Sequence, residues 1–227
     1  LLLEKNYTIK LLFTIFCLLV LINGTNFMDG VNGLCAGYYI VVIANVLIHS
    51  FYNNLPIEHH DLIVMLQFLL VFLSFNLISR SFLGDNGSYL ISMYIGIYLI
   101  IWVNKLPNLI SPYYICLLLW YPAFENLFSI LRRKTTKNKS TTYADNKHLH
   151  HLLFQALFKR VKFKKICNSL TGIIINSLNF IFIFFGGYFI NSSKILVFII
   201  IVMTSVYLFS YFCLKKNFKF KNIFKKY

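Results

Sequence analysis

Apolar residues form long runs separated by short polar segments, rather than recurring at the spacing of an amphipathic surface helix. A helix needs about 20 mostly apolar residues to cross a bilayer, because its backbone must satisfy its own hydrogen bonds there. We identify about seven such runs. They lie near residues 8–23, 35–51, 62–80, 88–104, 112–131, 168–190 and 195–214. The pattern predicts an all-α integral membrane protein with about seven transmembrane helices.

The composition agrees with this prediction. Hydrophobic residues make up 58% and charged residues 13% of the 227 residues, and the mean hydropathy is +0.68. A soluble domain carries about 25% charged residues, roughly twice this share. We therefore expect one membrane domain over residues 1–214 and a basic tail over residues 215–227.

One connecting segment, residues 132–167, is long and contains a helical pattern of its own. Its apolar residues recur at helical spacing: Leu149, Leu152, Leu153, Ala156, Leu157 and Val161. Asp145 or Asn146 suits the N-cap position of this helix. Lys and Arg between the apolar positions favour a helix that lies at the membrane interface. A surface helix packed on the bundle fits the pattern equally well.

The net charge of +15 is concentrated in segment 132–167 and in the tail. With seven spans, these two segments lie on the same side of the membrane. Positively charged loops remain in the cytoplasm, so we expect a cytoplasmic tail and residues 1–7 outside. The basic residues then bind anionic lipid headgroups. This placement argues against nucleic acid as a partner.

Three polar motifs fall on the predicted cytoplasmic side. The first, residues 23–33, contains Asn23, Asn26, Asp29 and Asn32 among three glycines. Its amides and carboxylate can bind a nucleotide or a metal, and glycine lets the backbone approach a ligand closely. The alternative is a solvated turn between two helices, since Gly and Asn favour turns.

The second motif, residues 82–88, holds Asp85 between two glycines. Only seven residues of the chain are acidic, so a carboxylate at the membrane surface is notable. Mg²⁺ takes one or two protein carboxylates and completes its shell with phosphate oxygens and water. The Asp85 carboxylate can therefore bind Mg²⁺, but so short a motif by itself favours a simple turn.

The third motif is the histidine group His148, His150 and His151, at the start of the predicted helix. A helix start favours anions, and imidazoles there can hold a diphosphate or assist proton transfer. Zinc is the alternative ligand, although only Asp145 lies at supporting spacing. The three motifs on one face together suggest a nucleotide-diphosphate substrate at the membrane surface.

The order of these motifs carries a family resemblance. The strings N-x-x-N-F-M-D-G-x-N-G, F-L-G-D-x-G-S and D-x-x-H-L-H-H follow one another between spans. This pattern resembles the polyprenyl-phosphate N-acetylhexosamine-1-phosphate transferases (glycosyltransferase family 4). The superfamily includes phospho-MurNAc-pentapeptide transferase and the eukaryotic enzyme that starts N-glycan assembly on dolichol. The resemblance covers roughly residues 8–215.

The resemblance implies a reaction at the inner face of the plasma membrane. A sugar 1-phosphate, expected to be N-acetylhexosamine 1-phosphate, passes from a UDP-sugar to undecaprenyl phosphate. UMP is released, and the lipid-linked sugar initiates a cell-surface glycan. The family uses Mg²⁺, and a homodimer is compatible with its members.

The resemblance also implies roles for individual residues. Asp85 would bind Mg²⁺ and, with Asp29 and the three histidines, would be catalytic. The histidines His148, His150 and His151 would contact phosphate or sugar. The residues expected to bind the nucleotide sugar are Asn23, Asn26, Asn32, Arg132 and Arg133, with Asp29 in the same pocket. The two arginines and the His-x-His-His form match the N-acetylhexosamine branch more closely than the muramyl-pentapeptide branch.

The chain departs from the family pattern at three points. Asn32 stands where many members have Asp, and Ala144 stands where Pro often precedes the Asp of the histidine motif. The family also has an Asp-Asp pair in an earlier cytoplasmic loop, and no such pair occurs in this chain. The chain begins at Leu1 without Met, so we expect a C-terminal portion that is inactive alone.

Two other functions fit parts of the pattern. A transporter of lipid-linked sugars would place ionisable residues inside the spans. The polar residues noted there are Asn45, Asn76, Asn176 and Asn179, which are typical of contacts between helices. A non-catalytic membrane paralogue would keep the spans and lose the chemistry.

Overall fold

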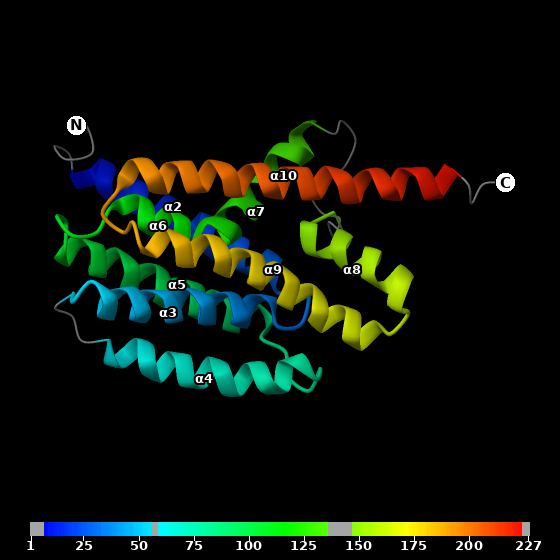
Figure 1. The fold of residues 1–227 in the computed structure, drawn as a ribbon, viewed down its shortest axis with the longest axis horizontal. Coiled ribbons are helices and arrows are strands. Elements are labelled where there is room, and N and C mark those ends of the chain that lie inside the picture. The colour runs from blue at the N-terminus through cyan, green and yellow to red at the C-terminus, as the bar shows by residue number, and fades with distance from the viewer. Residues whose placement is uncertain (1–6, 56–58, 136–146, 224–227) are drawn as a thin grey trace.

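The computed structural model describes residues 7–55, 59–135 and 147–223, and this part of the chain consists of helices joined by turns, with no strand (Figure 1). The helices are α2 (Tyr7–Met28), α3 (Leu34–Tyr52), α4 (His60–Leu77), α5 (Gly84–Lys105), α6 (Pro112–Leu118), α7 (Trp120–Thr135), α8 (Leu149–Val161), α9 (Lys164–Gly187) and α10 (Ser193–Ile223).

Six of the described helices are long and apolar enough to cross a membrane: α2, α3, α4, α5, α9 and α10. The pair α6 and α7 would make a seventh span, but its two halves meet at an angle of 72°. The predicted class, an all-α multi-pass membrane protein, is confirmed. The apolar run predicted over 112–131 is present, but it is divided between these two helices.

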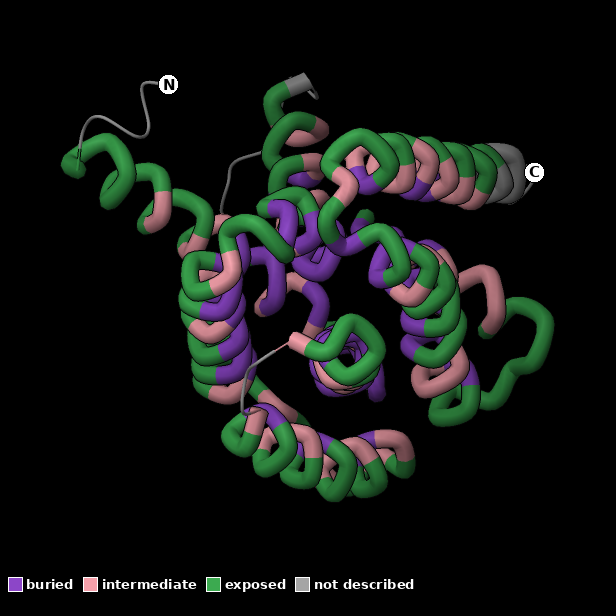
Figure 2. Tube along the Cα trace, turned by 60° about the vertical axis from the view of Figure 1, so that its left-hand side comes forward, coloured by how far each residue is buried: buried purple, intermediate pink, exposed green. Residues whose placement is uncertain are grey.

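Helix α3 lies inside the bundle, whereas α4 and α10 lie at its margin. In the most apolar window of each span, 61% of α3 is buried, against 17% of α4 and 22% of α10. Figure 2 shows buried segments turned toward the middle of the bundle and exposed segments turned outward. Helix α3 packs on α4 and α9, and α2 packs between α5 and α7. Lipid rather than water suits the exposed apolar faces.

The break between α6 and α7 follows from Pro122. In a continuous helix the N–H of residue 122 would bond to the carbonyl of Leu118, but proline has no N–H and its ring clashes there. The hydroxyl of Tyr38 donates to that carbonyl instead (2.8 Å) and accepts the N–H of Tyr121 (3.3 Å). Tyr38 therefore satisfies the backbone on both sides of the break from inside the bundle.

The backbones of α2 and α7 touch next to the break. A Cβ atom on Gly24 would overlap the carbonyl of Pro122, so no larger residue fits there. The side chain of Asn126 donates to the carbonyl of Val20 (3.0 Å), which ties the same two helices together again. These contacts orient α7 after it leaves the direction of α6.

Several helix ends differ from the predicted runs. Helix α2 continues to Met28, since Thr25 binds the carbonyl of Leu21 and the hydroxyl of Tyr39 within the packed bundle. Asn23 and Asn26 therefore lie on a helix and not in a loop. Helix α5 begins already at Gly84, which places Asp85 in its first turn.

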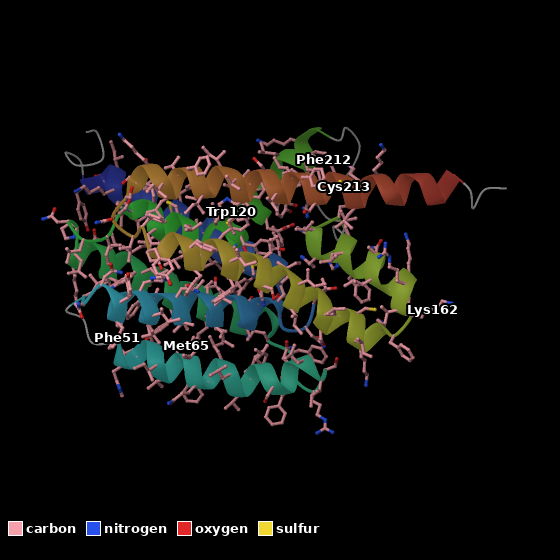
Figure 3. All side chains as sticks on the ribbon, in the orientation of Figure 1. Phe51, Met65, Trp120, Lys162, Phe212 and Cys213 are labelled. Atoms are coloured by element: carbon pink, nitrogen blue, oxygen red, sulfur yellow. The ribbon has the colours of Figure 1, made fainter. Side chains whose placement is uncertain are left out.

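Helix α8 begins at Leu149 with His148 in the N-cap position, so the expected N-cap at Asp145 or Asn146 is wrong. Asp145, Asn146 and also Ala144 lie outside the described residues. The helix packs against α9 and α10, with Leu149 and Leu152 buried. It lies at the end of the bundle opposite Phe51, near the labelled Lys162 (Figure 3).

The role of Tyr38 predicts a specific loss of stability. Tyr38→Phe leaves the carbonyl of Leu118 and the N–H of Tyr121 without partners, which costs about 1–3 kcal/mol. We expect a lower thermal unfolding temperature for the detergent-solubilised chain. Tyr114 is equally buried, and its hydroxyl has no hydrogen-bond partner, so Tyr114→Phe is the matched control and should not destabilise. Equal unfolding temperatures for the two variants would contradict the role given to Tyr38.

Candidate functional site

The turn between α2 and α3, residues 29–33, is anchored by amide side chains from two other helices. The N–H of Gly33 donates to Asn76 Oδ1 of α4 (2.6 Å), and Asn176 Nδ2 of α9 donates to the carbonyl of Gly33 (2.8 Å). Gly33 has a φ of +75°, which favours glycine. On the α9 side, a Cβ on Gly172 would overlap the carbonyl of Asn32. The turn is thus held between α4 and α9.

Asn32 takes part in this anchoring. It is only 4% exposed, and its Nδ2 donates to the hydroxyl of Ser79 beyond the end of α4 (2.6 Å). Its backbone N–H reaches Asn168 Oδ1 of α9 (3.3 Å). These contacts link the first motif to the α4–α5 connection, and the expected role of Asn32 in binding the nucleotide stays a prediction.

The two carboxylates of the first and second motifs come together. Asp29 Oδ2 accepts the backbone N–H of Gly84 at 2.9 Å, next to the exposed Asp85. Burial of Asp29 raises the pKa of its carboxyl to about 6, the bond from Gly84 opposes this shift, and the charge of Asp85 adds to it. The raised pKa agrees with the closeness of the two carboxylates.

Asn26 joins α2 to the first turns of α5. Its Nδ2 donates to the hydroxyl of Tyr89 (3.1 Å), and the hydroxyl of Ser88 donates to its Oδ1 (3.4 Å). Asn23, one turn earlier, is exposed and donates to the carbonyl of Leu19 on its own helix. Asn26 thus lies close to Asp85, whereas the structure brings Asn23 to no other motif residue.

The histidine motif lies against the first motif. His150 is fully buried, and a Cβ on Gly30 would lie 2.7 Å from its Nε2. The rings of His150 and His151 are 4.3 Å apart between centroids, and those of His148 and His150 are 5.5 Å apart. Burial lowers the pKa of His150 well below its usual value, with smaller effects from His151 and His148. His150 is therefore a neutral imidazole beside Gly30.

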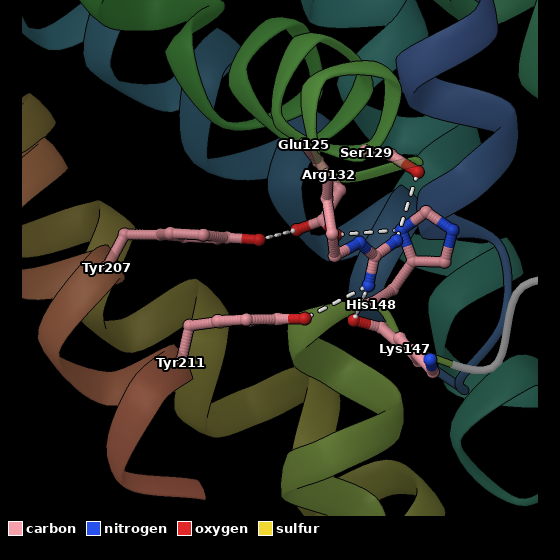
Figure 4. Close-up of polar contacts among 7 residues, drawn as sticks. All are labelled: Glu125, Ser129, Arg132, Lys147, His148, Tyr207 and Tyr211. Atoms are coloured by element: carbon pink, nitrogen blue, oxygen red, sulfur yellow. Dashed lines mark hydrogen bonds and ion pairs between the residues drawn. The ribbon is translucent and has the colours of Figure 1, made fainter. Parts of the chain in front are cut away.

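His148 is paired with a residue that the sequence patterns did not single out. Its Nδ1 lies 2.8 Å from Glu125 Oε1 of α7, and both side chains are buried. The other carboxylate oxygen accepts a bond from Tyr207 of α10 at 2.6 Å (Figure 4). Glu125 falls in the run 112–131, where an acidic residue is a signal of a functional site.

Arg132 and Arg133 follow on the same helix. The guanidinium of Arg132 donates to the backbone carbonyl of Lys147, to the hydroxyl of Tyr211 (3.1 Å) and to the hydroxyl of Ser129 (3.1 Å; Figure 4). Arg133 is half-buried one position further on. The expected binding of substrate by the two arginines stays a prediction.

The paired carboxylates fit a hard cation such as Mg²⁺, which needs only one or two protein oxygens. Within the described ranges, no three His, Cys, Asp or Glu side chains are arranged to hold a metal ion. The fold and this site define a multi-pass helical membrane protein with a carboxylate- and histidine-bearing polar site at one end of the bundle.

Known proteins are similar to this chain in sequence. The model of glycosyl transferase family 4 matches residues 1–103. A probable undecaprenyl-phosphate N-acetylglucosaminyl 1-phosphate transferase of Bacillus subtilis is 26% identical over 141 residues, which are 62% of this chain and 39% of the relative. The decaprenyl-phosphate N-acetylglucosaminephosphotransferase of Mycolicibacterium smegmatis is 28% identical over 170 residues, 64% of this chain and 41% of the relative.

A phospho-N-acetylmuramoyl-pentapeptide-transferase of Fervidobacterium nodosum is 29% identical over 143 residues, 62% of this chain and 43% of the relative. The match of residues 1–103 to the glycosyl transferase family 4 model agrees with the family resemblance of the motifs. The chain matches about two fifths of the length of these curated relatives. No solved structure matches it.

The raised pKa of Asp29 predicts how stability depends on pH. Since its pKa rises from 3.8 to about 6 on folding, the folded chain binds more protons between these values. The contribution of Asp29 to stability is therefore highest below about pH 4 and is lost as the pH rises to about 6. We expect the unfolding temperature in detergent, without divalent cations, to show this loss.

In Asp29→Asn, the decrease in unfolding temperature between about pH 4 and pH 6 should be smaller than in wild type. Asp61→Asn, which changes an exposed carboxylate at the other end of the bundle, should leave it unchanged. If wild type and Asp29→Asn show the same slope between about pH 4 and pH 6, burial of Asp29 does not control it.

Proposed function

We propose that this chain forms part of a transferase that moves a sugar 1-phosphate from a UDP-sugar to undecaprenyl phosphate. An oxygen of the lipid phosphate attacks the sugar-bearing phosphorus, and the bond from that phosphorus to the UMP oxygen breaks. The products are a diphosphate-linked lipid sugar and UMP. N-acetylhexosamine 1-phosphate is the proposed group, because relatives of this chain are named for N-acetylglucosamine.

One observation carries the proposal: the bond between Asp29 and the N–H of Gly84. It joins the first two motifs, and the packing of His150 on Gly30 adds the third. Carboxylates, amides and imidazoles from segments far apart in sequence thus meet at one end of the bundle. Phosphoryl transfer depends mainly on such positioning and on charge neutralisation.

The carboxylates, the histidines and Asn26 of the site have different proposed roles. Asp85 is exposed and can take a Mg²⁺ ion, with Asp29 as a second carboxylate that is mostly ionised at neutral pH. When bound, Mg²⁺ would offset the negative charge of the diphosphate. His150 and His151, in the first turn of α8, lie where the helix dipole favours an anion. Asn26 orients the start of α5.

Charge placement supports a cytoplasmic site in the plasma membrane. The described basic residues at the site end of the chain's helices are Arg80, Arg132, Arg133, Lys134, Lys147, Lys159, Arg160, Lys162, Lys164, Lys165, Lys215 and Lys216. The opposite helix ends carry Lys10, Lys105 and Lys194. The positive-inside rule then puts the site and the end of α10 in the cytoplasm, where basic residues meet anionic lipids.

Activity is proposed for the protein that contains this chain together with the further carboxylates of the family pattern. The chain itself has no Asp-Asp pair, and we propose that it is inactive alone. A homodimer stays a prediction. Glu125, in the bent α6–α7 segment, is an ionisable residue of the kind that a transporter would need, but it is paired with His148 of the site.

The test uses membranes containing the protein encoded by the full open reading frame, with labelled UDP-N-acetylhexosamine and Mg²⁺. We expect labelled lipid and UMP in equal amounts. Asp85→Asn should lower the rate roughly 100-fold or more, because the diphosphate loses its cation. Asp61→Asn is the matched control at the opposite end of the bundle.

The outcomes separate the three functions. An unchanged rate in Asp85→Asn would remove the metal role of Asp85. Movement of a lipid-linked sugar without release of UMP would indicate a transporter. Complete absence of both activities in the full-length protein would support the non-catalytic paralogue.

A further inference from the structure

Two side chains of α7 hold the start of α8. Glu125 binds the imidazole of His148, and Arg132 binds the backbone carbonyl of Lys147 (Figure 4). The two α7 residues are two helical turns apart and therefore share a face. Each is supported from α10, Glu125 by Tyr207 and Arg132 by Tyr211. We call this arrangement the α7–α10 clamp.

The α7–α10 clamp holds the start of α8, which has no capping hydrogen bond from its own side chains. His148 occupies the N-cap position with an extended backbone (φ −67°, ψ 153°), but its side chain makes no capping hydrogen bond. Instead its ring faces Glu125 on one edge, with Phe27 (5.2 Å) and His150 (5.5 Å) as ring neighbours between centroids. Glu125 is therefore the hydrogen-bond partner that orients this ring.

The chemistry of Glu125 selects one form of the imidazole. The carboxylate is 1% exposed, and its two oxygens bind His148 Nδ1 and the Tyr207 hydroxyl. An ionised carboxylate only accepts hydrogen bonds, so Nδ1 must carry a proton. The second ring nitrogen, Nε2, is then the one that can meet a ligand.

We propose that Glu125 is a positioning residue: it fixes the orientation and the Nδ1 proton of His148, so that Nε2 is presented to an anionic phosphate group of the substrate. This inference rests on the proposed transferase function. A buried pair of this kind adds little net stability compared with apolar residues of similar volume. Its main physical effect is thus the orientation of His148 and, through it, of the first turn of α8.

The experiment combines activity with a direct view of the imidazole. Glu125→Met keeps the side-chain volume and removes the acceptor. With the full-length protein in membranes, we expect kcat to fall at least about tenfold, since loss of the correct imidazole form is costly in comparable pairs. The KM for the UDP-sugar should change less than about threefold, because this variant leaves the carboxylate side of the site intact.

The proton position is read by nitrogen NMR of histidine-labelled protein. The chain has six histidines, and the signal of His148 is assigned by its loss in His148→Asn. In wild type we expect Nδ1 of His148 to be protonated, and in Glu125→Met this preference should be lost. Tyr207→Phe removes only the second contact of the carboxylate, so it should keep the Nδ1 proton.

Each outcome has a meaning. If wild-type protein makes no lipid product, the proposed function fails, while the NMR measurement still tests the role of Glu125. If Glu125→Met keeps wild-type kcat, or leaves the Nδ1 proton unchanged, the positioning role is wrong. Where Glu125→Met does not fold, Glu125→Leu, which also lacks an acceptor, replaces it, and retention of both kcat and the Nδ1 proton in that variant would equally overturn the proposal.

Discussion

Pro122 cannot donate a hydrogen bond to the carbonyl of Leu118, and the arrangement of the site depends on that missing donor. The chain turns by 72° at this point, and Tyr38 of the central helix α3 satisfies the exposed backbone groups. Because α7 takes a new direction, Glu125 and Arg132 reach the start of α8 instead of facing lipid. A straight span would leave the histidine motif without either contact.

On the other side of the site, amide side chains bind the backbone groups of a turn. Asn76 and Asn176 bind the backbone of Gly33 from two helices, in an interior where unpaired polar groups are costly. Each amide therefore specifies one geometry of the turn that ends at Gly33. The carboxylate of Asp29, at the start of that turn, can then reach the first N–H of α5.

The sequence was sufficient to predict the spans and the gathering of the three motifs. Apolar runs locate membrane helices reliably because the bilayer sets their length. The missed features depend on single residues within those runs: Pro122, which breaks a span, and Glu125, which binds His148. Helix ends were also misjudged, because α2 reaches Met28 through tertiary contacts such as Thr25 with Tyr39. No local pattern reveals such contacts between distant segments.

The contact at Gly24 has a mechanical consequence. The backbones of α2 and α7 touch, and Asn126 is bonded across them, so the two helices form one rigid unit. Asn26 and Asp29 at the end of α2 then travel together with Glu125 and Arg132 of α7. Any opening of the site to admit a bulky ligand must come from elements outside this rigid unit.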